Sequence, residues 1–241
     1  MKHIIGIFIG ILSFIIPLVS FSSDFQQQQN PLYPFKSSIF LQEEFLGGST
    51  ASNSIGALGW SAANGTVGNL AGETNRYGII RRDTSAVLGT IATLAINSGA
   101  EAATDPTVNH SIMFASRLNT NDANTTVRIG ALNSPSISPP ANGIFFEKLD
   151  ADTNWFCVTR SGGVQTRTNS GIAVNTSFNN FSYTRNSSGV LFSINNTVVC
   201  TNTTNITTTF LNPSLHIVTS AAAAKTIDTD YAQIIFTGLT R

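Results

Sequence analysis

Short runs of alternating apolar and polar residues, separated by turn-forming residues, are the feature that most constrains the fold of this chain. No run keeps a 3.6-residue period over a helical length, and the alanines at 221–224 are too few to nucleate a helix. Short strands with Gly, Asn and Ser between them are typical of an all-β sandwich or barrel. The pattern predicts a short strand from residue 39 and further strands at 77–81, 90–96, 110–118, 126–132, 143–149, 154–159, 165–168, 177–185, 190–194, 197–201, 214–220 and 226–236.

The clearest hairpin lies in the segment NSSGVLFSINNTVVCTN. Two strand-like runs, 190–194 and 197–201, flank the pair Asn195-Asn196, and Asn is favoured in tight turns. Because side chains alternate along a strand, Phe192 and Ile194 are expected on one face and Leu191 with Ser193 on the other.

The first 23 residues are predicted to be a secretory signal peptide. Lys2 precedes a long apolar run, and small residues follow it at Ser20 and Ser22. The alternative is a membrane anchor, but the run from residue 4 to 19 is shorter than the roughly 20 residues that a bilayer requires, and Pro17 interrupts it. We therefore expect a secreted or surface-associated protein with no stable membrane span once the signal is removed.

Two further segments follow the signal. Residues 24–38 combine a glutamine run with two prolines, so they are predicted to be a flexible lead-in. Residues 39–241 are predicted to form one domain, which begins with a short strand and then a Gly-, Ala-, Ser- and Asn-rich stretch as far as about residue 72.

The composition is unusually poor in charge. Charged residues make up 11% of the chain, against roughly 25% in ordinary soluble domains. The formal net charge is zero, so no basic face is expected to neutralise phosphates, and nucleic acid is an unsuitable partner. A surface of hydroxyls and amides has little electrostatic self-repulsion, which suits self-association or packing in a larger surface assembly.

The two cysteines, Cys157 and Cys200, leave two alternatives open. An oxidising compartment would allow them to form a disulfide. They fit equally well as two buried thiols that behave as small apolar residues.

Several segments resemble, in their order, the concanavalin A-like (laminin-G-like) jelly-roll modules of phage virion surface proteins and secreted bacterial proteins. These segments are NRYGIIRRDTSAVLGTIATLAI, NWFCVTRSGGVQTRTNSGIAVN, FNNFSYTRNSSGVLFSINNTVVCTNTTNI and LHIVTSAAAAKTIDTDYAQIIF. The resemblance covers roughly residues 40–236 and implies a two-sheet antiparallel jelly-roll sandwich. This architecture includes lectins, glycanases, adhesion modules and capsid decorations, so function has to be argued from the site. The predicted signal peptide favours an exported cellular protein over a virion part.

Catalytic candidates are few. Only His110 and His216 remain outside the signal, and no G-x-S-x-G stretch is present, which argues against a Ser-His-acid hydrolase. The resemblance makes a glycanase the better enzymatic alternative, and such enzymes use two carboxylates across one bond. The nearest pair, Glu147 and Asp150, is three residues apart and should point to opposite faces of a strand. We therefore expect no catalytic centre.

The segment Asp150-Ala-Asp152-Thr-Asn154 has two interpretations. Its three oxygen-bearing side chains alternate, so they could be aimed together at a calcium ion. The favoured interpretation is a turn whose side chains bind backbone N–H groups ahead of the Trp155 strand, because the Gly and Glu of an EF-hand loop are missing.

Carbohydrate binding requires exposed aromatic rings. Trp60, Tyr77 and Tyr183 are the candidates, although aromatic residues in a sandwich more often fill the core. The sequence thus predicts a non-catalytic structural or assembly protein, with a lectin-like adhesion module as the alternative.

Overall fold

The computed structural model describes residues 38–46, 55–69, 73, 76–96, 109–119, 123–134 and 138–238. Within these ranges no helix is long and apolar enough to cross a membrane. The predicted signal peptide and almost all of the predicted lead-in lie outside them. The regular elements are strands: β1 Ser38–Glu43, β2 Trp60–Ala63, β3 Thr66–Asn69, β4 Ile80–Asp83, β5 Ile91–Ile96, β6 Asn109–Leu118, β7 Thr125–Leu132, β8 Gly143–Lys148, β9 Asn154–Ser161, β10 Val164–Ala173, β11 Asn179–Asn186, β12 Gly189–Ile194, β13 Thr197–Asn202, β14 Asn212–Thr219 and β15 Thr226–Thr237.

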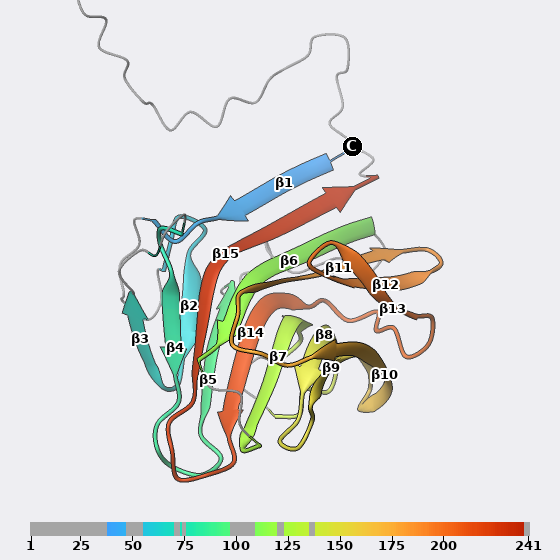
Figure 1. Cartoon of the computed structure of the whole chain (residues 1–241). Coiled ribbons are helices and arrows are strands. Elements are labelled where there is room, and N and C mark those ends of the chain that lie inside the picture. The colour runs from blue at the N-terminus through green and yellow to red at the C-terminus, as the bar shows by residue number, and fades with distance from the viewer. Residues whose placement is uncertain are drawn as a thin grey trace, which may run out of the picture. The chain divides into compact units, whose positions relative to one another are not determined.

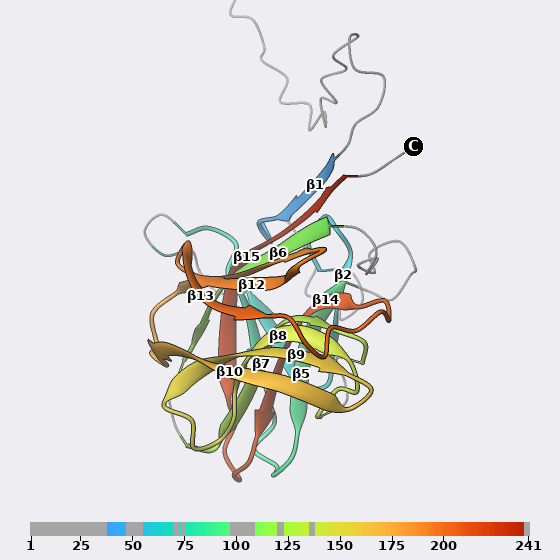
Figure 2. The ribbon, with the colours of Figure 1, turned by 90° about the vertical axis from the view of Figure 1, so that its right-hand side faces the viewer.

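The strands form two antiparallel sheets that pack face to face (Figures 1 and 2). Sheet A has the order β13-β12-β11-β6-β15-β4-β3, and β1 pairs with the second half of β15. Sheet B has the order β10-β9-β8-β7-β14-β5-β2. The predicted all-β jelly-roll sandwich is therefore confirmed, and its core is filled by the inward faces of both sheets.

Aromatic rings from both sheets meet in the core. Trp60 contacts Phe114 edge to face, with ring centroids 5.7 Å apart, and Trp155 contacts Phe181 at 4.6 Å. Trp60 and Trp155 belong to sheet B, whereas Phe114 and Phe181 belong to sheet A. Such pairs contribute about 0.5–1.5 kcal/mol beyond the burial of their area. The rings therefore help to hold the two sheets against each other.

A disulfide also joins the sheets. Cys157 lies on β9 of sheet B and Cys200 on β13 of sheet A, with Cα atoms 6.4 Å apart. Both side chains are buried. The alternative of two separate thiols is therefore wrong in this structure.

The predicted hairpin is confirmed by β12 and β13. Phe192 and Ile194 are buried, while Leu191 and Ser193 on the other face are partly exposed. Asn195 and Asn196 form the turn, and both have positive φ, which Asn tolerates better than most residues.

Two short strands, β2 and β3, were not predicted from the sequence. They lie in the stretch rich in small residues, and Asn64 and Gly65 connect them with positive φ at both positions. A Cβ atom on Gly65 would approach the carbonyl oxygen of Asp83 to 2.1 Å. Gly is therefore required where the chain passes from sheet B to sheet A.

Candidate functional site

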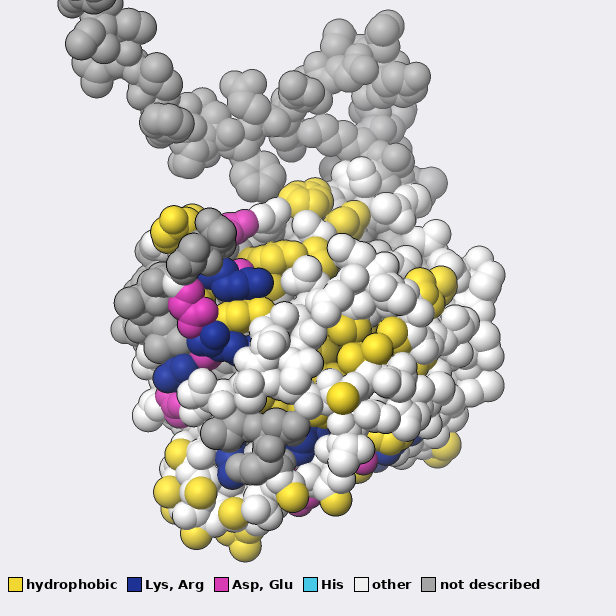
Figure 3. Space-filling view, in the orientation of Figure 1, with side chains coloured by type: hydrophobic (Ala, Val, Ile, Leu, Met, Phe, Trp, Pro, Cys, Tyr) yellow, Lys and Arg dark blue, Asp and Glu magenta, His cyan; other side chains and the backbone are white. Residues whose placement is uncertain are grey.

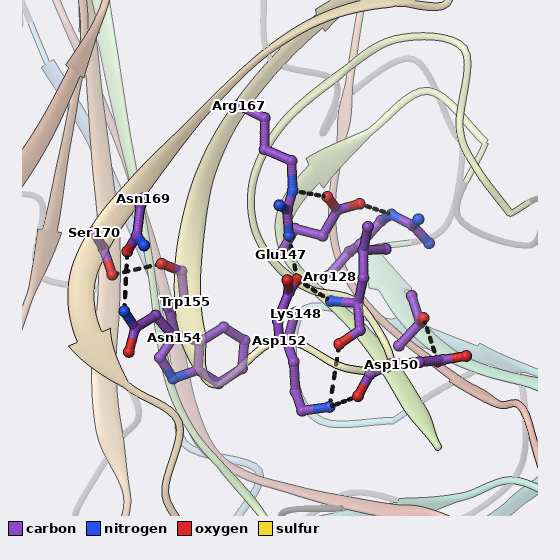
Figure 4. A network of polar contacts seen from close by, with 12 residues as sticks. Arg128, Glu147, Lys148, Asp150, Asp152, Asn154, Trp155, Arg167, Asn169 and Ser170 are labelled. Carbon is purple, nitrogen blue, oxygen red and sulfur yellow. Dashed lines mark hydrogen bonds and ion pairs between the residues drawn. The ribbon is translucent and has the colours of Figure 1, made fainter. Parts of the chain in front are cut away.

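A network of ion pairs lies on the outer face of sheet B, centred on Glu147 of β8 (Figure 4). Alternation along β8 sends Ile144 and Phe146 into the core, so Glu147 points to the opposite face. One carboxylate oxygen accepts a hydrogen bond from Arg128 Nε of β7 at 3.0 Å, and the other accepts from Arg167 Nε of β10 at 2.8 Å. Two guanidinium groups thus occupy both oxygens of this carboxylate.

The two arginines have further partners. Arg128 donates to Ser138 Oγ in the β7–β8 connection at 2.9 Å, and burial lowers the pKa of its guanidinium. Arg167 lies over the ring of Phe156, 3.4 Å from its centroid, and also binds Asp152. The network therefore connects β7, β8 and β10 and fixes the turn after β8.

The residues predicted as a calcium site do not converge. Asp150 Oδ1 accepts hydrogen bonds from the hydroxyls of Thr126 and Ser220. Asp152 Oδ2 accepts from Leu149 N at 2.7 Å and from Arg167, while Asn154 Nδ2 donates to Asn169 Oδ1 at 3.3 Å. Figure 4 shows these side chains turned toward different partners.

The interpretation as a turn accounts for these contacts, since Asp152 binds a backbone N–H ahead of the Trp155 strand. In the ranges that the structure describes, no group of three His, Cys, Asp or Glu side chains could hold a metal ion. The geometry thus gives no support to a calcium site at residues 150–154.

The three aromatic candidates for sugar stacking are placed very differently. Trp60 is 0% exposed and Tyr183 1% exposed, so both rings fill the core and offer no face to a ligand. Tyr77 is 69% exposed. The sequence pattern could not separate these cases. An aromatic side chain suits either face of a strand, as for Trp60 and Tyr183, and Tyr77, predicted to begin a strand, lies ahead of β4.

Sheet A carries a second charged network on its outer face. Asp228 of β15 accepts from Arg81 of β4 at 2.7 Å and from Arg117 of β6 at 3.0 Å, and Arg117 also pairs with Glu73. The guanidinium groups of Arg117 and Arg76 both lie over the ring of Phe178, at 4.5 and 4.2 Å. Figure 3 shows the resulting alternation of acidic and basic side chains on this face.

The neighbouring Arg82 has a different environment. It is 1% exposed and donates to the carbonyl oxygens of Ala63 and Asn64, and burial lowers its pKa to about 10. Arg81 and Arg82 therefore do not form a paired surface for an acidic glycan, because Arg81 is tied to Asp228 and Arg82 points inward.

His216 continues the row of Glu147 and Arg128 across sheet B. Register places it beside Arg128 on one side and Thr93 on the other. Its ring is fully buried, and neither nitrogen has a hydrogen-bond partner among the residues that the structure describes. Burial, and secondarily the charge of Arg128, lowers the pKa of His216 to about 3.

The depressed pKa of His216 predicts that acid destabilises the fold. The unfolded chain, with a His pKa near 6.5, binds a proton more readily than the folded chain, so stability should fall as pH drops from about 6.5 toward 3. The slope contributed by this residue is at most about 1.4 kcal/mol per pH unit. Urea unfolding at several pH values should show a flatter profile for His216→Leu than for the unmodified chain. Parallel profiles over this range would contradict the assignment.

A shallow hollow near the edge of the core is lined in part by Ser116, Arg117, Asn175 and Asn179, and it leaves no enclosed space for even a water molecule. Pockets for drug-sized ligands usually measure roughly 300–1,000 Å³. This hollow is therefore small for an organic ligand of that class.

No pattern in the sequence was taken to predict a role for Arg128 or Arg167, or the pairing of Glu147 with them. A signal was available: Arg128 interrupts the apolar strand TTVRIGAL, and Glu147 follows two phenylalanines in GIFFEK. Single charges in otherwise buried strands of a low-charge chain indicate that they are paired with each other.

Comparisons with known proteins reveal similarity in fold alone. No protein-family description matches the chain, and no curated protein matches it. A protein of unknown function from Shewanella oneidensis MR-1 superposes with a TM-score of 0.64 at 14% identity, over 86% of this chain and 90% of that one.

Two other similar structures have a described role. A structure from work on endo-acting O-glycanases of human gut microbiota that initiate mucin breakdown has a TM-score of 0.58 at 10% identity, over 83% of this chain and 99% of that one. A structure of botulinum neurotoxin type C, whose cell entry depends on two ganglioside molecules, has a TM-score of 0.53 at 12% identity, over 82% and 49%. This chain is therefore similar in fold to proteins of binding, catalytic and unknown roles.

Proposed function

We propose that the chain is an exported, non-catalytic β-sandwich that acts through its surface as a component of a larger surface assembly. The observation that carries this proposal is the binding of Glu147 by Arg128 and Arg167. Glu147 and Asp150 are the two carboxylates of the nearest candidate pair for glycan hydrolysis in the sequence. Both carboxylate oxygens of Glu147 accept hydrogen bonds from these arginines, so Glu147 is poorly placed to act on a substrate.

The neighbouring acids support the same conclusion. Asp150 is engaged by two hydroxyls and Asp152 by Arg167 and a backbone N–H. Hydrolysis of a glycosidic bond uses one carboxyl group as a proton donor and a second as base or nucleophile, both facing the substrate. Here the acids serve to connect strands.

A surface role suits the other properties of the domain. The inter-sheet disulfide is of a kind that persists in oxidising compartments, in line with the predicted signal peptide. The low charge of the chain reduces repulsion between copies or between the chain and a neighbouring surface. Paired charges and a cross-linked core make a rigid unit for display.

Glycan binding is the second candidate. It is favoured by the exposed ring of Tyr77 and by the fold similarity to a toxin described as interacting with gangliosides. The ring of Tyr77 offers a stacking face, whereas the neighbouring Glu73 and Arg76 are already paired with Arg117 and Asp230.

Light scattering and a glycan array separate the two candidates. The assembly role predicts discrete species heavier than one chain and no saturable binding to any glycan. Binding that is saturable, is lost in Tyr77→Ala and is kept in the control Phe210→Ala, which alters another exposed ring, would instead establish the glycan-binding role. A strictly monomeric protein would contradict self-assembly.

A further inference from the structure

Two neighbouring loops form an exposed apolar tip at one end of the sandwich. The β4–β5 loop contributes Ala86, Val87 and Leu88, of which Val87 is 62% and Leu88 67% exposed. The β14–β15 loop contributes the four alanines 221–224, three of them exposed. The loops lie side by side at the bottom of Figure 1, where Figure 3 shows a cluster of hydrophobic atoms. We refer to residues 85–89 and 220–224 as the two-loop tip.

Hydrogen bonds join the two loops at the base of the tip. Gly89 N donates to the carbonyl oxygen of Thr219 at 2.8 Å, and Thr219 N donates to the carbonyl oxygen of Thr90 at 3.1 Å. Thr84 and Lys225 exchange a further pair of bonds. The loops therefore move as one unit and present their apolar side chains together.

Threonine side chains satisfy polar groups inside the tip. The Thr90 hydroxyl lies within hydrogen-bond distance of the carbonyl oxygens of Ser85 and Val87, which share its one hydrogen. The Thr219 hydroxyl likewise shares its hydrogen between the carbonyl oxygens of Ala221 and Ala223, and its oxygen accepts from Ala221 N. A backbone carbonyl that already accepts a hydrogen bond within the protein costs less free energy when its water is removed. A segment that enters an apolar medium has to meet this requirement.

The tip carries no charge. No Asp, Glu, Lys or Arg occurs from Thr84 to Thr90 or from Thr219 to Ala224. The adjacent Lys225 is buried, and the adjacent Asp83 accepts hydrogen bonds from Thr66 and Thr226. The two-loop tip is therefore poorly suited to a partner that is recognised through charge, and it is well suited to an apolar partner.

We propose that the two-loop tip inserts into the apolar boundary of a lipid surface. A standard protein interface buries about 800 Å² on each partner, and two large side chains with a few alanines on a convex tip fall well short of that. A lipid surface needs no matching shape, and it accepts apolar side chains together with satisfied backbone. Because the tip has no basic residue, the surface is one of neutral headgroups.

The tip alone gives weak, reversible binding, since only Val87 and Leu88 contribute large apolar area. Several copies in one assembly would bind more firmly through effective concentration. The lipid contact thus adds an attachment surface to the proposed assembly. Lipid binding can be tested whether or not the chain forms such an assembly.

An environment-sensitive fluorophore reports on the tip directly. It is attached in the full chain to Leu88→Cys and, as the control, to Val198→Cys, which replaces another exposed apolar residue outside the tip. The native cysteines are joined in a disulfide and leave the new thiol as the labelling site. Phosphatidylcholine vesicles should shift the emission of the label at 88 to shorter wavelength, saturably and equally at low and high salt, and leave the label at 198 unchanged.

A site-specific readout is needed because the apolar run at residues 4–19 can itself bind lipid. In vesicle co-sedimentation, the double variant Val87→Ser with Leu88→Ser should weaken the vesicle affinity that the two-loop tip provides by about tenfold or more. The control double variant Val164→Ser with Val198→Ser should bind vesicles as the unmodified chain does. An unchanged label at 88, or equal shifts at 88 and 198, would overturn the proposal. A shift that follows protein concentration without vesicles would assign the tip to a second copy and also overturn it.

Discussion

Replacing Glu147 with Ala should lower the free energy of unfolding by about 3–5 kcal/mol, because it leaves Arg128 buried without its counter-charge. Arg128 is only 4% exposed, whereas Arg167 keeps Asp152 as a partner. Urea unfolding followed by far-UV circular dichroism measures the change. Glu44→Ala, which alters an exposed carboxylate, should change stability by less than about 0.5 kcal/mol.

A double variant distinguishes a lost ion pair from lost packing. Arg128→Leu with Glu147→Leu removes both charges and restores apolar volume, so it should cost clearly less than Glu147→Ala alone. If the double variant is destabilised by as much as Arg128→Leu alone and Glu147→Leu alone together, the two charges do not act as a pair, which contradicts this interpretation of the network.

Removing the disulfide should have an effect of similar size. The bond closes a loop between positions 43 residues apart, and loop-closure entropy predicts a loss of about 4 kcal/mol when it is absent. Cys157→Ala with Cys200→Ala removes the bond, and refolding the unmodified chain under reducing conditions removes it without changing the sequence. Guanidinium unfolding measures both.

The two routes should agree within about 1 kcal/mol, because the cysteine side chains are small and their packing contributes less than the cross-link. A loss below about 1 kcal/mol by both routes would mean that the bond does not restrict the unfolded chain appreciably.

Much of the fold followed from the alternation of side chains. Most strands from β5 to β15 were predicted nearly in place, since most have several residues of alternating character and end near Gly, Asn or Ser. Two predictions were less accurate: β10 continues to Ala173, well beyond the predicted 165–168, and the strand predicted at 77–81 is β4, which begins at Ile80. The strands β2 and β3 were missed because WSAA and TVGN are short and made mostly of small residues. β2 pairs with β5 of sheet B and β3 with β4 of sheet A, and the Asn64-Gly65 turn takes the chain from one sheet to the other, a signal that the apolar pattern does not contain.

The candidate site was predictable only in part. The turn at Asp152 followed from local chemistry, since a carboxylate two or three residues from a backbone N–H binds it readily. The Arg128–Glu147–Arg167 network depends on β7, β8 and β10 coming together, and their separation in sequence conceals it. Likewise, whether Trp60, Tyr77 or Tyr183 is exposed depends on which face of each element meets the other sheet.

The two networks have a common design, in which one buried acid is held by arginines from other strands of the same sheet: Glu147 on sheet B and Asp228 on sheet A. In a chain with so few charges, these acids are used to connect strands. The two-loop tip, by contrast, has exposed side chains that take no part in these networks.

The most direct test of the central claim is a reducing-end assay of the purified protein and of Glu147→Gln against a panel of glycans that includes mucin O-glycans. The account predicts that neither protein releases reducing ends above a blank without enzyme. Release by the unmodified protein that disappears in Glu147→Gln, with the variant still folded by circular dichroism, would contradict it.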